Sequence, residues 1–212
     1  KFLMDPMLQF GVEKVSAMGY GNAINVLSDA EGGIAKYFSQ RFAQVTNPPL
    51  DSIRESDGMT LRVALGEKPF AGISRSRQLL INSPILKMSE MLKIREQEAS
   101  PVKTFDILFE PVLGGGIANE DAMTKAIEKI ANEVASFAKS KGGIVIISDR
   151  NISKNRAAIP LIIAISAINQ KLIEEGVRLQ ISIVVESGQI ASSHHIACAL
   201  GFGASAVYPL SV

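Results

Sequence analysis

Four short apolar runs, separated by helical segments, constrain the fold of this chain more than any other feature. The runs are residues 103–111, 142–148, 179–187 and 204–209, and they are rich in β-branched side chains. Apolar runs of this length are typical of strands that are covered on both faces. A chain that alternates strand, helix and strand needs crossover connections, so the pattern predicts an α/β fold with a mostly parallel sheet, closed like a barrel or open.

Three helices are expected between these strands. The longest begins near Asn119, a suitable N-cap residue, and ends before Gly142, which follows a lysine-rich turn. The second runs from Pro160 to Gly176, and the third ends at Gly201. The buried face of the first helix is predicted from apolar residues at helical spacing, namely Ala126, Ile127, Ile130, Val134 and Phe137.

The first half of the chain is less regular. An apolar stripe at helical spacing predicts a helix that packs inward, formed by Ile34, Tyr37, Phe38, Phe42 and Val45. With 212 residues, 47% of them hydrophobic, the chain can bury a core of ordinary size. We therefore treat residues 1–212 as one domain, with an irregular half (1–100) and a β/α repeat half (101–212).

Composition excludes several classes of function. The net charge of +1, with scattered Lys and Arg, gives no basic stripe for nucleic acid. The single cysteine, Cys198, excludes an intrachain disulfide and cannot by itself hold an iron–sulfur cluster or a structural zinc. The longest apolar run, residues 159–168, is too short to cross a bilayer, and no secretory leader is visible. We expect no membrane partner and a cytoplasmic location.

Ligand sites in parallel α/β folds gather at the carboxyl ends of the strands. Asp149 and Arg150 follow one predicted strand, and Glu186 lies near the end of the next. Catalysis is one interpretation of Asp149 and Arg150. The interpretation that we favour is structural, with the aspartate capping a turn and the arginine tying that turn to a neighbouring element.

Two further motifs suggest binding sites only weakly. The three glycines at residues 114–116 follow a strand, but they lack the G-x-G-x-x-G spacing and the P-loop lysine, so they predict a flexible connection. His194 and His195 are neighbours in a predicted helix and point about 100° apart, so joint metal ligation is not expected even with Cys198 nearby. We expect no metal site, and no Ser-His-Asp or Cys-His arrangement emerges.

A helix-breaking segment, Thr46-Asn47-Pro48-Pro49, interrupts the first half. The prolines force extended backbone, so the carbonyls of Thr46 and Asn47 lose helical partners and must find other donors, water or a ligand. Just beyond, we expect Arg54 and Glu55 to form an ion pair that pins the segment, within the domain or against a neighbouring one.

Several motifs occur in a recognisable order. They are "MGYGNAINVLSD", "YFSQRFAQVTNPPLDSIRE" followed by "MTL", "SPIL", "SDRNISKNRAAIP" and "VVESGQIASSHHIACALGFGASAVYP". In their order and spacing they cover nearly the whole chain from Met7, and this combination resembles the central domain of the glutamate synthase large subunit.

The resemblance implies a fold and a function. Glutamate synthase makes two glutamates from glutamine, 2-oxoglutarate and a reductant. Its amidotransferase domain releases ammonia, and its FMN-binding barrel uses that ammonia. The central domain is a connecting domain that resembles an incomplete or distorted TIM-like barrel related to the FMN domain. It has no catalytic activity and no cofactor of its own, since FMN and the iron–sulfur cluster are bound by other domains.

The resemblance also implies an ammonia-tunnel gate at Met18, Thr46 and Asn47. This chain departs from the family pattern near the first of these, because Gly21, Asn22 and Ala23 stand where relatives usually have Asp-Thr-Pro. The implied partners are the amidotransferase and FMN-binding domains of the same polypeptide, with ammonia in transit. The residues that select NADPH, NADH or ferredoxin lie outside this chain.

An alternative function remains. The chain would then be an independent α/β enzyme or phosphate-binding protein that uses the strand ends, namely Gly114, Gly115, Gly116, Asp149, Arg150 and Glu186.

Overall fold

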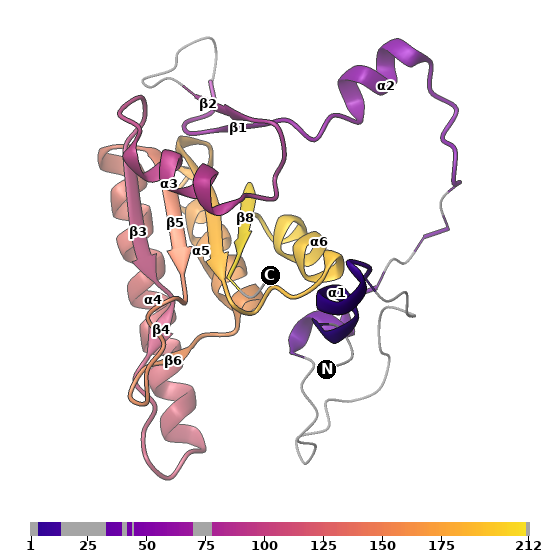
Figure 1. Ribbon diagram of the computed structural model, residues 1–212. Helices are drawn as coiled ribbons and strands as arrows, with labels where there is room; N and C mark the ends of the chain where they lie inside the picture. Colours follow the sequence, from indigo (N-terminus) through magenta and orange to yellow (C-terminus); the bar gives the residue numbers. More distant parts are fainter. Residues whose placement is uncertain (1–3, 14–32, 40–41, 44, 70–77, 211–212) are drawn as a thin grey trace.

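A four-stranded parallel sheet is the centre of the structure, a computed structural model (Figure 1). The structure describes residues 4–13, 33–39, 42–43, 45–69 and 78–210. The strands, in their order across the sheet, are β3 (Val102–Asp106), β5 (Gly143–Ser148), β7 (Ile181–Ser187) and β8 (Ala206–Pro209). Every residue of β5 and β7 is buried, which explains why both are mostly apolar, with Ser182 and the polar residues at the strand ends, Ser148, Glu186 and Ser187, as the exceptions.

Three helices connect these strands and cover one face of the sheet. They are α4 (Ile117–Ser140), α5 (Leu161–Glu174) and α6 (Ser193–Gly201). The predicted face of α4 is confirmed, since Ile130, Val134 and Phe137 are buried and Ala126 and Ile127 are partly buried against the same core. On this side the sheet contributes residues such as Val145, Ile147, Ile183 and Val185.

A smaller layer covers the other face. It consists of α3 (Met88–Glu96) and an antiparallel pair, β1 (Val63–Leu65) and β2 (Leu79–Ile81). The buried side chains of this layer are Leu65, Met91 and Ile94, and they pack against Ile144, Ile146 and Val184 of the sheet. Residues 63–69 and 78–210 therefore form three layers, with the sheet in the middle (Figure 1).

The described strands form an open sheet, not a closed barrel. β3 is one edge, and β8 is the other. At the β8 edge the segment before α3 adds a parallel bridge between Ile85 and Val207. The prediction of an α/β fold with a mostly parallel sheet is confirmed, whereas barrel closure is not seen in the described residues.

The predicted strand 103–111 is two strands in different sheets. After β3, Ile107 donates its N–H to Ser148, and its carbonyl oxygen accepts the N–H of Ile159. The chain then forms β4 (Leu108–Phe109), which pairs antiparallel with β6 (Ala157–Ala158). The single-strand prediction is wrong because the apolar run continues through a change of pairing partner.

The expected end of α4 is confirmed, and its expected start is wrong. At the end, the N–H groups of Lys141 and Gly142 both bond to the Phe137 carbonyl, and Gly142 has a φ of 67°. At the start, Gly116 is the N-cap. Asn119 lies inside the helix, and its side-chain oxygen accepts the N–H of Val112 at 2.6 Å instead of capping.

The predicted helix through residues 34–45 is also wrong. The described elements of the first half are short: α1 (Met4–Phe10), η1 (Ile34–Tyr37) and α2 (Ser52–Gly58). Phe38 leaves η1 with extended backbone and packs edge-to-face on Phe202 of the second half, with ring centroids 5.0 Å apart. Phe42 and Val45 are 80% and 67% exposed, so they do not pack inward.

One further short helix, η2 (Arg178–Gln180), precedes β7. Within the described part of the chain, no helix has both the length and the apolar character needed to cross a membrane.

Candidate functional site

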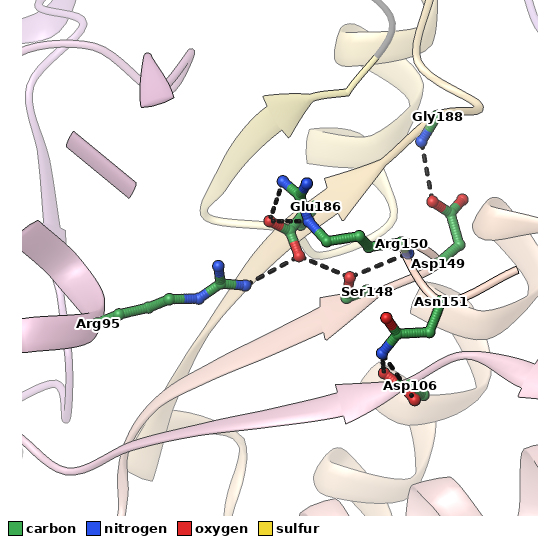
Figure 2. Close-up of polar contacts among 8 residues, drawn as sticks. All are labelled: Arg95, Asp106, Ser148, Asp149, Arg150, Asn151, Glu186 and Gly188. Carbon is green, nitrogen blue, oxygen red and sulfur yellow. Dashed lines mark hydrogen bonds and ion pairs between the residues drawn. The ribbon is translucent and has the colours of Figure 1, made fainter. Parts of the chain in front are cut away.

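The carboxyl end of the sheet carries a buried carboxylate held by two arginines. Glu186 of β7 is 1% exposed and lies beside Ser148, its partner in register on β5. One carboxylate oxygen accepts from Arg150 Nη2 at 3.0 Å and Nε at 3.2 Å. The other accepts from Arg95 Nη2 at 2.9 Å and Ser148 Oγ at 2.6 Å. Figure 2 shows both guanidinium groups pointing toward this carboxylate.

These contacts keep Glu186 ionised. Burial acts to raise the pKa of the Glu186 carboxyl. Hydrogen bonds from Arg150, Ser148 and Arg95 outweigh burial, so the pKa lies below its usual value. The hydrogen bond to Glu186 in turn raises the pKa of Arg150. A carboxylate that is charged and fully hydrogen-bonded stabilises its surroundings and is poorly suited to proton transfer near neutral pH.

Asp149 forms a second buried cluster, one residue after β5. It is 1% exposed. One oxygen accepts the N–H of Gly188 at 2.9 Å, and the other accepts from Ser187 Oγ at 2.6 Å and Gln189 Nε2 at 3.0 Å. Asp149 thus holds the turn after β7, which Figure 2 shows for its bond to Gly188.

Gln189 extends this cluster to α5. Its side-chain oxygen accepts the N–H of Leu161, the first residue of α5, at 2.9 Å. Its side-chain nitrogen also donates to the Ile159 carbonyl at 3.0 Å. Because the first N–H groups of a helix have no partner within the helix, this contact satisfies a group that would otherwise be buried unpaired.

Asp106 at the end of β3 forms a third, more open cluster. Its oxygens accept from Asn151 Nδ2 at 3.2 and 3.3 Å, and from Arg156 Nη2 at 3.1 Å. The Arg156 and Asp106 side chains are 43% and 29% exposed. Each of the three carboxylates at this end of the sheet is therefore engaged by groups of the chain itself.

The histidines have separate contacts. His194 Nε2 lies 2.7 Å from the Ala35 carbonyl and 3.6 Å from Cys198 Sγ. His195 Nδ1 lies 2.6 Å from Ser192 Oγ, the N-cap of α6. Burial raises the pKa of Cys198 and lowers that of His195. Among the described residues no three His, Cys, Asp or Glu side chains are grouped as metal ligands.

The Thr46-Asn47-Pro48-Pro49 segment belongs to an exposed arm, residues 45–62, in which every residue is exposed. The arm carries α2 away from the sheet (Figure 1). Thr46 and Asn47 both lie in bends. Met18, the third residue of the expected gate, lies outside the described residues, as do Gly21, Asn22 and Ala23.

The arm has its own local contacts. Asp51 caps α2 by accepting the N–H groups of Ile53 and Arg54. Arg54 Nε lies 3.4 Å from an Asp51 oxygen, and both side chains are mostly exposed. Glu55 is exposed, and its backbone N–H bonds to the Asp51 carbonyl.

Gly114, Gly115 and Gly116 form a turn that leads into α4. All three have positive φ, and the Gly115 N–H bonds to the Val112 carbonyl at 3.2 Å. A separate open groove of about 640 Å³ lies between β3 and α4 and is lined in part by Lys103, Asn132 and Lys141. This groove is at the amino end of β3, far from the polar clusters.

Sequence reasoning singled out Asp149, Arg150 and Glu186 but missed their partners and the third cluster, among them Arg95, Asp106, Ser148 and Gln189. Asp106 and Ser148 are the last residues of β3 and β5, so their positions at the carboxyl edge follow once the strand ends are known. Arg95 lies in α3, a segment for which the sequence predicted neither a helix nor a strand. No local pattern in the sequence pairs Arg95 with Glu186.

The comparisons with known proteins agree with one another. A family model described as the glutamate synthase central domain matches residues 1–212. The chain is 35% identical over 212 residues to the ferredoxin-dependent glutamate synthase of Cyanidium caldarium, covering 99% of this chain and 14% of that protein. It is 33% identical over 214 residues to the glutamate synthase (NADPH) large chain of Bacillus subtilis, covering 99% and 13%.

A third relative is the glutamate synthase (NADH) of Saccharomyces cerevisiae. It is 36% identical over 215 residues, which cover 98% of this chain and 10% of the yeast protein. The chain therefore spans only 10–14% of the length of these three relatives.

Proposed function

Because this chain belongs to the glutamate synthase central domain family, we propose that it is the non-catalytic connecting domain of a glutamate synthase large subunit. It positions a glutamine amidotransferase domain and an FMN-binding synthase domain of the same polypeptide, and it forms part of the ammonia passage between them. The observation that carries this proposal is the family match over residues 1–212, together with relatives that align over 98–99% of the chain.

The carboxyl-end clusters support a structural role for this chain. A catalytic acid or base must reach the proton that it transfers. Glu186 and Asp149 are buried and accept hydrogen bonds from the chain itself, and Asp106 is bound by Asn151 and Arg156. Their contacts join neighbouring strands, loops and helices, which suits a domain whose work is to hold others in place.

The whole polypeptide would convert glutamine, 2-oxoglutarate and a reductant into two glutamates. FMN and an iron–sulfur cluster would be bound by the other domains, with no cofactor in this chain. The three relatives are named for ferredoxin, NADPH and NADH, and their sequence identities to this chain are similar. Sequence similarity therefore does not indicate which electron donor the whole polypeptide would use. The relation to the FMN barrel remains a proposal, supported by four parallel strands joined by helices, half the number in a TIM barrel.

The exposed arm is the part that we assign to the ammonia passage. Two prolines keep Thr46 and Asn47 out of regular structure, and both residues are exposed, so their peptide groups can face a neighbouring domain. Neutral ammonia needs a path shielded from bulk water, with some polar groups and no strong acid that would trap it as ammonium. Peptide groups meet this requirement. Met18 completes the proposed gate.

Bulky substitutions in the complete enzyme test this assignment. Thr46→Trp and Asn47→Trp should raise the ratio of glutamine hydrolysed to glutamate formed, because ammonia is then blocked or lost. Ser56→Trp is a matched control on α2 of the same arm, also at an exposed position, and should leave the ratio unchanged. Unchanged coupling in folded Thr46 and Asn47 variants would remove the gate from the proposal.

A further inference from the structure

The helix α3 carries large apolar side chains on two faces. Met91 and Ile94 face the sheet and are each 1% exposed. Met88 and Leu92 are 65% and 48% exposed, and residues four apart lie one above the other on a helix surface. Met88 and Leu92 therefore form an exposed apolar strip on the outer side of α3, among the polar residues of that helix.

This outward stripe continues beyond the two residues. Ile85, just before the helix, is 47% exposed. Arg95 is three residues after Leu92 and seven after Met88, so it lies on the same face. We name these four residues, Ile85, Met88, Leu92 and Arg95, the α3 surface.

The α3 surface ends at a pair of arginines with an excess of positive charge. Arg95 and Arg150 share the single carboxylate of Glu186, and their side chains are 34% and 50% exposed. A guanidinium has five N–H donors. The bonds to Glu186 use one from Arg95 and two from Arg150, so donors remain for a second carboxylate. The charges of Lys93 and Glu96, both exposed on the same helix, cancel each other.

We propose that the α3 surface docks an apolar face of another domain of the same polypeptide, and that a carboxylate at the edge of that face binds Arg95 and Arg150. This inference rests on the proposed function, because it needs a polypeptide longer than this chain. Methionine and arginine are enriched at protein interfaces, and arginine is frequent among the residues that dominate binding.

Charge and shape favour this occupant over two others. A second copy of the chain, docked through the same surface, would bring two more arginines to a site that is already positive. A small anion would meet only the arginines, whose charge Glu186 partly neutralises, and would leave the stripe of Ile85, Met88 and Leu92 in water. An apolar face with a carboxylate at its edge would cover the apolar side chains and also bind the arginines.

Site-specific photo-crosslinking in the complete native polypeptide tests the proposal. A photoreactive phenylalanine analogue replaces Met88, and in a control it replaces Ile173, which is 53% exposed on α5 across the sheet. We expect Met88 to cross-link to a peptide outside residues 1–212 of the same polypeptide that contains an Asp or Glu. A cross-link to a second copy, or a yield no higher than that at Ile173, would overturn the proposal.

A charged substitution sharpens the test. Leu92→Asp, placed in the Met88-analogue polypeptide, should lower the cross-link yield by at least about fivefold, because a carboxylate would be buried against an apolar face. Ile173→Asp in the same background should not change it, and circular dichroism checks that both variants fold. An unchanged yield with Leu92→Asp would contradict the docking.

Glutamate formation from glutamine and 2-oxoglutarate is measured on the same preparation. A preparation that forms glutamate without the Met88 cross-link would refute the α3 surface and leave the proposed function standing. One that cross-links as expected but forms no glutamate would refute the proposed function alone.

Discussion

Arg95 of α3 and Glu186 of β7 form an ion pair with 2.9 Å between Nη2 and Oε2, although they lie 91 residues apart in the sequence. Arg150 binds the other oxygen of the same carboxylate. Parallel sheets usually bind ligands at this edge. Here an internal carboxylate lies between the two arginines and joins the outer layer to the sheet.

We expect Glu186→Gln to lower the free energy of unfolding by about 2–4 kcal/mol, because an amide cannot accept all the hydrogen bonds of the carboxylate and leaves two arginines without their counter-charge. Urea unfolding of the chain measures this change. Glu98→Gln, at an exposed position, is the matched control and should stay within about 0.5 kcal/mol of the parent. A similar small effect at Glu186 would mean that the network adds nothing to stability.

The same carboxylate predicts a pH dependence. The pKa of Glu186 in the folded chain lies below its ordinary value of 4.5, so its contribution to stability is present above that value and is lost as pH falls through the folded pKa. The difference in unfolding free energy between the parent and Glu186→Gln should therefore be larger at about pH 6 than at about pH 3. A difference independent of pH would contradict a depressed pKa.

The second half of the chain was predictable where burial is complete. β5, β7 and β8 and the helices between them follow from apolar runs and periodicity, because both faces of the sheet are covered. The strand 103–111 was not, since pairing changes at Ile107 without a change in composition. Asn119 is a good cap in isolation, but the tertiary fold uses its side chain to hold Val112.

For the first half of the chain, the sequence predicted correctly only that the structure would be irregular. The stripe at Ile34 to Val45 has helical spacing, yet spacing stabilises a helix only where a core accepts the stripe, and Phe42 and Val45 are 80% and 67% exposed. Asp149 and Arg150 were placed at the right edge of the sheet by strand order. Their partners are Glu186 on the neighbouring strand and the turn after β7, and local pattern does not specify these pairings.

Gly143→Ala should be strongly destabilising. Gly143 begins β5 with a φ of 106°, and a Cβ there would lie 2.3 Å from the Pro101 carbonyl oxygen. Backbone strain and overpacking together predict a loss of about 3–5 kcal/mol. Gly201→Ala is the matched control, because a Cβ at Gly201 has no neighbour within 4 Å and its φ is not positive. Thermal unfolding of both variants measures the contrast, and a well-folded Gly143→Ala protein would show that the backbone here relaxes easily.

Ligand binding separates the connecting domain from the alternative, an independent phosphate- or cofactor-binding enzyme. A ligand that binds with a dissociation constant near micromolar, present at a hundred times that concentration, would raise the free energy of unfolding by about 2.7 kcal/mol. For a chain of this size, that raises the melting temperature by about 5–10 °C. We expect FMN and inorganic phosphate to leave the melting temperature of this chain unchanged, because Glu186 partly neutralises the two arginines and a small anion covers none of the apolar side chains beside them. A shift of several degrees that disappears in Arg150→Gln would instead establish an anion site at the carboxyl end of the sheet, because that substitution removes the guanidinium while leaving Asp149 and its turn in place.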